Sequence, residues 1–452
     1  MPDRGGTGNK TLSSRFFRRL VPENQIFCRL LTLAVVASVC QLLPAPPSVA
    51  RGVTLTVAGF GYQVAERLSR EGLDDFVRRT GIQVEFIPSW GTSTNQLALI
   101  LRTLKNHYRT PDVYVIDMIW PGTLQQDLLD LTPYLDEDSR AHLPELLRND
   151  TVNGRIVSLP FYVNTGLLYY RTDLLKKYGY QRPPATWKEL ERMAARIQGG
   201  ERSAGHRGFW GYVWQGGAYE GLTCNALEWQ ASFGGGRIIE EDGTITVNNP
   251  RTAQALREAT AWIGSISPPS VLTYTEADSL NAFRSGNAAF LRYWSSGVRS
   301  NRGADSAIKG RFDVTLLPAG PHGRAQTTGG FELAVSRYSA HQREAAEFVV
   351  YLTGSKVQKS RAIQEGYLPT IPRLYGDPEI LNAVPEAKVV ERAGRKSWIS
   401  RPSSIAGQKY SDVSKSYYRA VHRILSRQSL PQEGLADLER ELVDLRIGGS
   451  LN

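Results

Sequence analysis

Strand and helix patterns alternate between residues 53 and 116, and this alternation constrains the fold more than any other feature of the chain. Val53-Thr54-Leu55-Thr56-Val57 has the two-residue period of a half-buried strand. Apolar residues at helical spacing follow as far as Val77. After them come a second strand pattern at 82–87, a helix pattern at 96–106 and a third strand pattern at 112–116. Strands separated by helices indicate a mostly parallel sheet covered by helices. We therefore expect an α/β fold.

Residues 1–50 have the composition of a secretory signal peptide. Arginines between Arg15 and Arg29 precede an apolar run from Leu30 to Val39, and Ser48-Val49-Ala50 ends the segment with small residues at its last and third-last positions. The run is too short for a comfortable membrane span, although a retained anchor is an alternative. Cys40 could carry a lipid, but the bulky Val39 precedes it. We expect cleavage after Ala50 and a periplasmic or other extracytoplasmic location, and we do not favour a lipid anchor.

Charge and cysteine content exclude several classes of function. The net charge is +10, part of it in the leader, and the basic residues form no run in the remaining chain, which argues against a nucleic-acid groove. Cys28 and Cys40 would leave with the leader, so Cys224 would have no disulfide partner. The six histidines lack metal-binding spacing, and no GxSxG motif is present. We expect no cofactor and no metal.

The remainder of the chain contains further strand and helix patterns. Residues 156–159 and 166–170 have the pattern of two strands joined through 160–164. Thr186-x-x-Glu189 is a capping box that starts one helix, and Asn249-Pro250 starts another. We also expect strands at 288–293 and 331–335 and two helices near the C-terminus, at 413–424 and 435–445.

The segment Val213–Gly235 combines tryptophans, a tyrosine, glutamates and glutamines with glycines. Aromatic faces provide apolar area, and carboxylates or amides bond several hydroxyls at once. A sugar ring, with flat apolar faces and a polar rim, suits this combination. We expect Tyr219 and Glu220, near the start of a helix, to contact a ligand. Trp229 is better interpreted as a core residue.

Other candidate residues have a structural and a ligand-binding interpretation. Asp117 follows a buried strand and is either the N-cap of the next helix or an acceptor for ligand hydroxyls. Trp294, at the end of a strand, either packs in the core or forms a stacking platform. Arg401 before Pro402 is usually a solvated loop cation. Gly59-Phe60-Gly61 imitates a dinucleotide fingerprint, but Val64 occupies the position of the third glycine.

An enzymatic alternative also has candidate residues. Glycosidases act through two carboxylates, and Asp117 and Glu220 would be the candidates here. A surface module that binds polymeric glycans is a further alternative.

Seven segments, in the same order along the chain, resemble the extracellular solute-binding proteins of sugar ABC importers, and most of all their trehalose/maltose-binding branch. The segments are DVYVIDMIWPG (112–122), LPFYVNTGLLYYRTDLL (159–175), WQGGAYEGL (214–222), FRSGNAAFLRYW (283–294), TTGGFELAVS (327–336), GYLPTIPRLYGDP (366–378) and the late stretch 401–425.

The resemblance implies the two-lobed, type II fold of the periplasmic binding proteins, with a hinge between α/β lobes and the ligand in the cleft. We expect one lobe from 51–163 and 327–364, and the other from 164–326 and 365–452. It also implies a non-catalytic, monomeric protein that delivers a disaccharide or small glucoside to a membrane permease.

The resemblance further implies a set of ligand-binding residues. They would supply hydroxyl acceptors and donors, one stacking ring and closely approaching backbone amides: Asp117, Tyr162, Asn164, Tyr219, Glu220, Trp294, Gly329, Gly330 and Arg401, with Gln63 and Gln96 matching only loosely. Relatives often have an aspartate where this chain has Asn164, so the exact sugar is left open.

Overall fold

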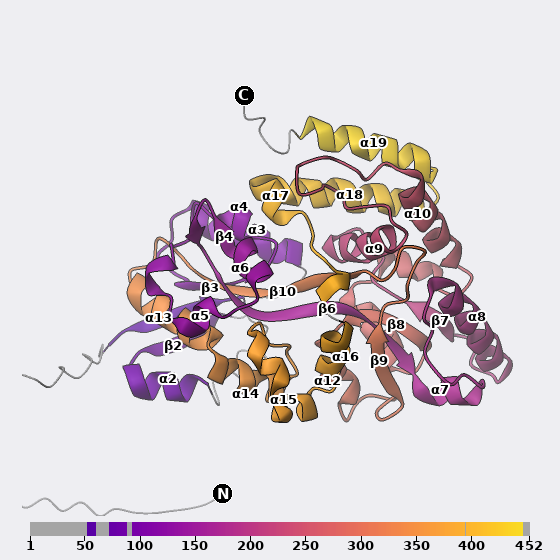
Figure 1. Ribbon diagram of the computed structural model, residues 1–452, viewed down its shortest axis with the longest axis horizontal. Coiled ribbons are helices and arrows are strands. Elements are labelled where there is room, and N and C mark those ends of the chain that lie inside the picture. Colours follow the sequence, from indigo (N-terminus) through magenta and orange to yellow (C-terminus); the bar gives the residue numbers. More distant parts are fainter. Residues whose placement is uncertain (1–51, 60–71, 88–92, 394, 446–452) are drawn as a thin grey trace, which may run out of the picture. The chain divides into compact units, whose positions relative to one another are not determined.

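The computed structural model describes residues 52–59, 72–87, 93–393 and 395–445 (Figure 1). The expected signal peptide and Gln63 lie outside these described residues. No helix within the described ranges is long and apolar enough to cross a membrane.

The first strands form a parallel sheet, as the alternating pattern predicted. β1 (Thr54–Ala58) pairs in parallel with both β2 (Gln83–Ile87) and β3 (Val113–Asp117). Alternate residues of β3 belong to two different hydrophobic clusters. Val113 and Val115 lie in one cluster, and Tyr114 and Ile116 lie in the other. Helices α2 (Leu73–Thr80), α3 (Ser93–Lys105) and α13 (Gln342–Thr353) supply residues to these clusters. The strand is therefore buried on both faces, and only its end is available to a ligand.

Two long strands connect this part of the sheet to the rest of the protein. β10 (Gln326–Val335) runs antiparallel to β3 through its second half and to β6 (Leu159–Arg171) along most of its length. The expectation of two short strands around a connection at 160–164 was wrong, because β6 is one strand of 13 residues. A register shift between Phe331 and Glu332 leaves Phe161 as an extra residue in β6, directly after Pro160, and prolines within sheets are found at such bulges.

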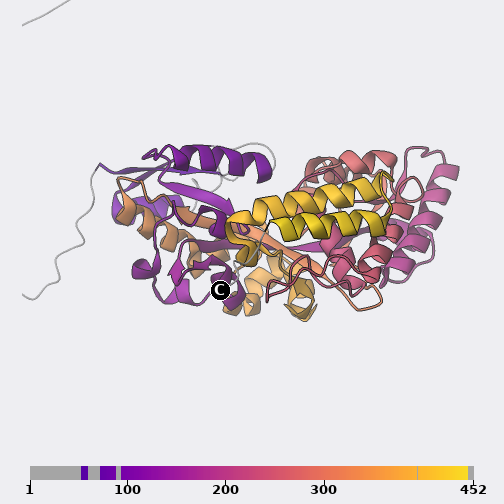
Figure 2. The ribbon, with the colours of Figure 1, turned by 90° about the horizontal axis from the view of Figure 1, so that it is seen from above.

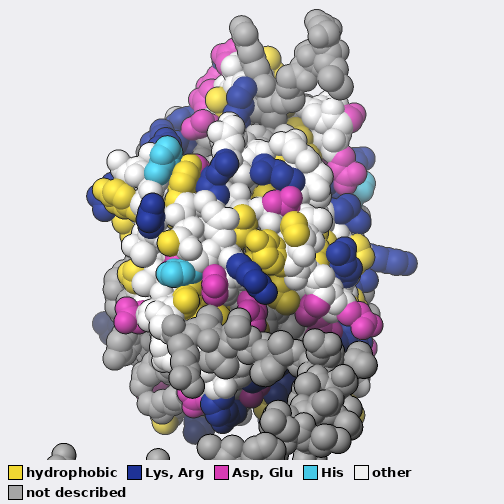
Figure 3. Space-filling model, turned by 90° about the vertical axis from the view of Figure 1, so that its left-hand side faces the viewer, with side chains coloured by type: hydrophobic (Ala, Val, Ile, Leu, Met, Phe, Trp, Pro, Cys, Tyr) yellow, Lys and Arg dark blue, Asp and Glu magenta, His cyan; other side chains and the backbone are white. Residues whose placement is uncertain are grey.

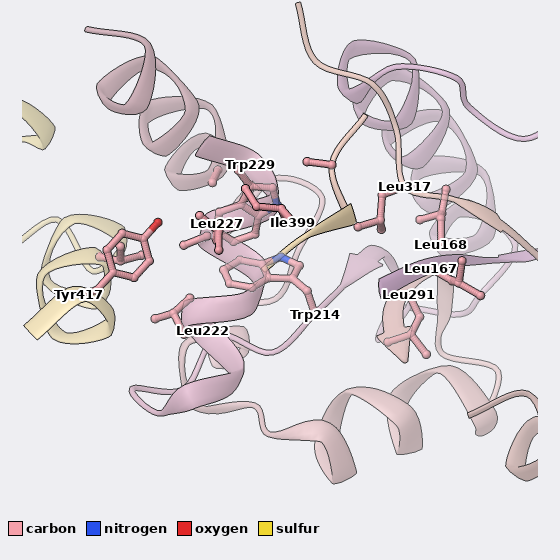
Figure 4. Packing of buried hydrophobic residues seen from close by; sticks show 14 of the residues in the cluster. Leu167, Leu168, Trp214, Leu222, Leu227, Trp229, Leu291, Leu317, Ile399 and Tyr417 are labelled. Carbon is pink, nitrogen blue, oxygen red and sulfur yellow. The ribbon is translucent and has the colours of Figure 1, made fainter. Parts of the chain in front are cut away.

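The second half of β6 continues into a further set of strands. It pairs with β8 (Ala288–Trp294) and β9 (Phe312–Leu316), and β7 (Trp210–Val213) pairs in parallel with β8. Helix α8 (Trp187–Ser203) packs against β7 and β8, while α9 (Glu220–Ser232) packs against β10 and α10 (Pro250–Trp262) against α9 (Figure 1). Their core contains the fully buried Trp229, which contacts Trp214 edge to face at 4.9 Å between ring centroids (Figure 4). The core interpretation of Trp229 is therefore confirmed.

Helix ends agree with their sequence signals in most places. Asn249 caps α10 through hydrogen bonds from the N–H groups of Arg251 and Thr252. Thr186 caps α8 by accepting from the N–H of Glu189, but the Glu189 carboxylate bonds Ala185 in place of Thr186. The two C-terminal helices, α18 (Tyr410–Leu425) and α19 (Pro431–Asp444), lie side by side (Figure 2).

The other elements are short. They are α4 (Pro121–Leu124), α5 (Glu137–Arg140), α6 (Pro144–Asp150), β4 (Thr151–Val152), β5 (Arg155–Ile156), α7 (Thr172–Lys177), α11 (Glu276–Arg284), α12 (Gly297–Arg302), α14 (Ser355–Glu365), α15 (Pro378–Ala383), α16 (Glu386–Ala393), β11 (Trp398–Ile399) and α17 (Ser403–Ala406). On the face shown in Figure 3, the coloured Lys and Arg side chains are interspersed with acidic and uncharged ones.

Candidate functional site

A cavity of about 250 Å³ lies where β3, β6, β8 and β10 meet the start of α9. Every expected ligand-binding residue within the described ranges lines it: Gln96, Asp117, Tyr162, Asn164, Tyr219, Glu220, Trp294, Gly329, Gly330 and Arg401. Their contact with a ligand stays a prediction, but the fold brings them together from positions up to 305 residues apart in the sequence.

A larger cavity of about 660 Å³ shares Arg401 with the first cavity. It is lined by α6, by Arg237, Ile239 and Glu241, and by residues of the 395–405 segment. None of the other expected residues reaches it. We take the smaller cavity as the candidate site because all ten expected residues line it, whereas the larger cavity has only Arg401 of them.

Asp117 is the last residue of β3, and its Oδ1 atom accepts a hydrogen bond from the N–H of Ile119 at 3.3 Å. The following helix, α4, has Trp120 at its N-cap and no side-chain cap. The N-cap interpretation of Asp117 is therefore wrong. The short turn holds the carboxylate at the end of a buried strand, where it lines the cavity.

Arg401 connects two of the strongest candidates. Its Nη1 atom lies 2.8 Å from Oε1 of Glu220, and its Nη2 atom lies 3.4 Å from Oδ1 of Asp117. Only 3 % of the Arg401 side chain is exposed, so the interpretation as a solvated loop cation is wrong. The guanidinium joins the end of β3 to the first turn of α9 and leaves little of its charge for a ligand.

Glu220 is engaged by three donors. Its Oε1 atom accepts from Arg401 and from the Tyr410 hydroxyl at 2.5 Å, and its Oε2 atom accepts from the Ser414 hydroxyl at 2.5 Å. Burial raises the pKa of Glu220 above its usual range, while Arg401, Ser414 and Tyr410 act in the opposite direction. Tyr410 and Ser414 belong to α18, so this helix takes part in holding the site, which the sequence did not indicate.

Trp294 ends β8 and contacts both a cation and a glycine. The Arg292 guanidinium carbon stacks 4.2 Å from the centroid of the Trp294 ring, and Glu228 binds Arg292 at 2.9 Å in a fully buried ion pair. A Cβ atom on Gly329 would come within 2.9 Å of the ring. The absence of a side chain at Gly329 therefore lets the ring lie against the backbone of β10.

The crossing strands contribute polar groups beside this ring. Tyr162 stacks on Tyr367 with 4.1 Å between centroids, and burial raises its pKa well above the ordinary value, which keeps the hydroxyl protonated. Asn164 accepts from the Ser295 hydroxyl at 3.1 Å. Gly330 has a φ of +148°, and a Cβ there would lie 2.3 Å from the carbonyl oxygen of Tyr162.

Sequence reasoning missed Glu276 together with four other cavity-lining residues, Gly221, Cys224, Ser296 and Phe331. Glu276 is the first residue of α11. Its Oε2 atom accepts from the Tyr219 hydroxyl at 2.5 Å, and its Oε1 atom lies 3.4 Å from Nε1 of Trp294. The Thr275-x-x-Asp278 capping box marks this helix start in the sequence, but no local feature shows that α11 reaches the cavity.

Among the described residues, no group of three or more His, Cys, Asp and Glu side chains could hold a metal ion. The cavity instead presents carboxylates, hydroxyls and two amides around an indole ring. This arrangement can bond several hydroxyls and cover an apolar ring face. Within the part of the chain that the structure describes, one arginine lines the cavity, and two carboxylates already bind it.

Comparisons with known proteins agree with this geometry. The family described as bacterial extracellular solute-binding protein matches residues 63–359. A probable ABC transporter-binding protein of Deinococcus radiodurans is 42 % identical over 411 residues, which is 90 % of this chain and 96 % of the relative.

Solved structures share the fold. Maltose-bound MalE3 of T. maritima has a TM-score of 0.80 and 34 % identity, with 87 % of this chain and all of that chain covered. A solute-binding protein of Thermotoga lettingae bound to α-D-tagatose has a TM-score of 0.77 and 22 % identity, covering 87 % of this chain and 99 % of that one. The expected type II periplasmic binding protein fold is confirmed.

Proposed function

Because the chain belongs to the bacterial extracellular solute-binding proteins, we propose that it is the substrate-binding component of an ABC importer for a neutral sugar. Members of this family bind their solute and do not transform it, so the chain is a binding protein and not an enzyme. The glycosidase interpretation of Asp117 and Glu220 is set aside on the same ground.

The balance of charge at the cavity carries the proposal that the solute is neutral. Among the described residues, three carboxylates, Asp117, Glu220 and Glu276, line the cavity together with one arginine, which two of them bind. An anionic solute would face uncompensated negative charge, whereas hydroxyl groups would find acceptors. A phosphorylated or carboxylated solute is therefore disfavoured.

The ring of Trp294 and the maltose-bound relative support a small α-linked glucoside, of the trehalose or maltose type, as the solute. That relative is 34 % identical to this chain and is covered over its whole length. The tagatose-bound protein shares the fold alone at 22 % identity. An indole face suits the apolar face of a pyranose ring.

The mechanism that we propose is closure of two lobes over the sugar. One lobe, 51–163 with 327–364, would contribute Asp117, and the other, 164–326 with 365–452, would contribute Glu220 and Trp294. A ligand that bonds both lobes favours the closed state by its additional contacts there. The closed protein would then deliver the sugar to the membrane permease, working as a monomer outside the cytoplasm.

Purified protein from Arg51 to Asn452 tests the proposal by calorimetric titration. The panel contains trehalose, maltose, sucrose and one sugar phosphate. At a ligand concentration of 100 Kd, the free energy of unfolding should rise by about 2.7 kcal/mol, so thermal unfolding provides an independent readout. Binding of a neutral disaccharide that is recovered intact supports the proposal. Binding of the sugar phosphate alone, or release of glucose, would refute it.

A further inference from the structure

We infer that Glu276 is the second-lobe carboxylate that accepts hydrogen bonds from ligand hydroxyls, and that Glu220 holds Arg401 in place. This inference rests on the proposed function, because it names the acceptor that a neutral sugar would meet in the same cavity. It reverses the role expected for Glu220 from its position at the start of α9.

The hydrogen bonds of Glu220 are the first observation. A carboxylate offers about four acceptor positions, and three of those on Glu220 are taken by Arg401, Tyr410 and Ser414. All three partners are buried residues of this chain. A ligand hydroxyl that bonded Glu220 in place of one of them would leave a buried donor without an acceptor, and that loss offsets the gain.

Glu276 offers more free acceptor positions in the same cavity. Its Oε2 atom accepts from Tyr219, and its Oε1 atom has only the long contact with Trp294. The N-terminus of α11 does not need its carboxylate, because Asp278 accepts from the N–H and the hydroxyl of Thr275, both at 2.8 Å. The Glu276 side chain is thus available to the cavity.

The position of Glu276 matches the chemistry of a stacked sugar. Its carboxylate lies beside the indole N–H edge of Trp294, so a pyranose that stacks on this ring would direct edge hydroxyls toward it. Two carboxylate oxygens can accept from two adjacent hydroxyls. The ligand class is therefore a neutral sugar with adjacent free hydroxyls on the ring that covers Trp294.

Glu276→Gln separates ligand contact from positioning. The amide oxygen of glutamine can still accept from Tyr219, while its NH₂ group replaces an acceptor with a donor. Glu241→Gln is the matched control, because Glu241 lines the larger cavity and is 83 % exposed. With the disaccharide that the parent binds best, we expect Glu276→Gln to lose roughly 10- to 100-fold in affinity. The control should bind like the parent, and both variants should keep its melting temperature.

Glu220→Gln provides the contrast. Since it weakens the hold on Arg401 inside the protein, it should lower the melting temperature of the ligand-free protein, which Glu276→Gln should not. Monodeoxy analogues of the sugar then test direct contact. At least one analogue should bind the parent weakly, and Glu276→Gln should not weaken the binding of that analogue any further. A purely structural role of Glu276 predicts instead that Glu276→Gln weakens the binding of every analogue by the same factor.

The outcomes separate this inference from the proposed function. A parent protein that binds no neutral sugar overturns both. A parent that binds a sugar, with Glu276→Gln equally tight, overturns the role of Glu276 alone. A uniform loss across all deoxy analogues also overturns it, because it would show that Glu276 acts only through Tyr219 and Trp294.

Discussion

Two buried carboxyl groups should make the stability of this protein fall as the pH rises. Asp150, at the end of α6, and Glu332, in β10, are 0 % and 1 % exposed. Burial raises the pKa of Asp150 to about 8 and that of Glu332 well above its usual range, and the nearby Asp150 raises the pKa of Glu332 further. Asp150 is therefore mostly protonated in the folded protein at neutral pH.

The sign and size of the effect follow from proton linkage. An unfolded aspartate loses its proton near pH 4, whereas folded Asp150 keeps it until about pH 8. Between these values the native state binds more protons, so the free energy of unfolding falls with rising pH, by about 1.4 kcal/mol per pH unit for one proton. Over the whole window this amounts to roughly 5 kcal/mol. Stability from this source is complete below pH 4 and lost as the pH rises through 8.

Asp150→Asn removes this proton while its amide oxygen can still accept from the Ser158 hydroxyl, which donates to Asp150 at 2.9 Å. Urea unfolding of parent and variant between pH 5 and 8 measures the difference. The stability of the variant relative to the parent should increase by about 1.4 kcal/mol per pH unit between pH 5 and 7. Burial lowers the pKa of the folded His142 to about 4, so its unfolded form alone titrates in this range. That contribution is the same in both proteins and cancels in the difference. Parallel curves for the two proteins would refute the argument.

Three other predictions concern the cavity wall. Trp294→Ala should cost about 3 kcal/mol of sugar binding by calorimetry, whereas a core role predicts a lower melting temperature with unchanged affinity. Gly330→Ala should strongly lower the melting temperature, because of its positive φ and the Tyr162 carbonyl 2.3 Å away. In Gly329→Ala the nearest atoms to the new Cβ belong to the indole ring of Trp294, so this change should mainly weaken sugar binding. Equal melting temperatures for the Gly329→Ala and Gly330→Ala variants would contradict this prediction. Arg292→Met leaves Glu228 buried without its cation and should lower the free energy of unfolding in urea by about 3–5 kcal/mol. A smaller loss than that caused by Arg423→Met, which breaks an exposed ion pair, would contradict this prediction.

Local patterns predicted those parts of the fold that depend on local sequence. β1, β2 and β3 followed from residue periodicity, and the starts of α8 and α10 followed from capping residues. β6 was not predicted as one strand, because Pro160 and Gly166 interrupt its pattern, and only the pairing with β10 and β8 across the fold shows that it is continuous.

Site residues were predictable where they lie in a segment that resembles a known family or at the end of a predicted strand or helix. The sequence around Arg401 suggests only a loop, and its partners Glu220 and Asp117 lie 181 and 284 residues away. Glu276 has no distinguishing local context. Its importance arises from the packing of α11 against β8, which places it beside Tyr219 and Trp294.

The pairing of β3 with β10 also restricts the order in which the protein can fold. Val113–Asp117 finds its antiparallel partner only in Phe331–Val335, so a growing polypeptide that has not reached Phe331 leaves one edge of β3 without hydrogen bonds. Contacts this distant in sequence form slowly, since a long loop must close first. The half of the protein that carries Asp117 therefore cannot complete its sheet during synthesis of the first 330 residues.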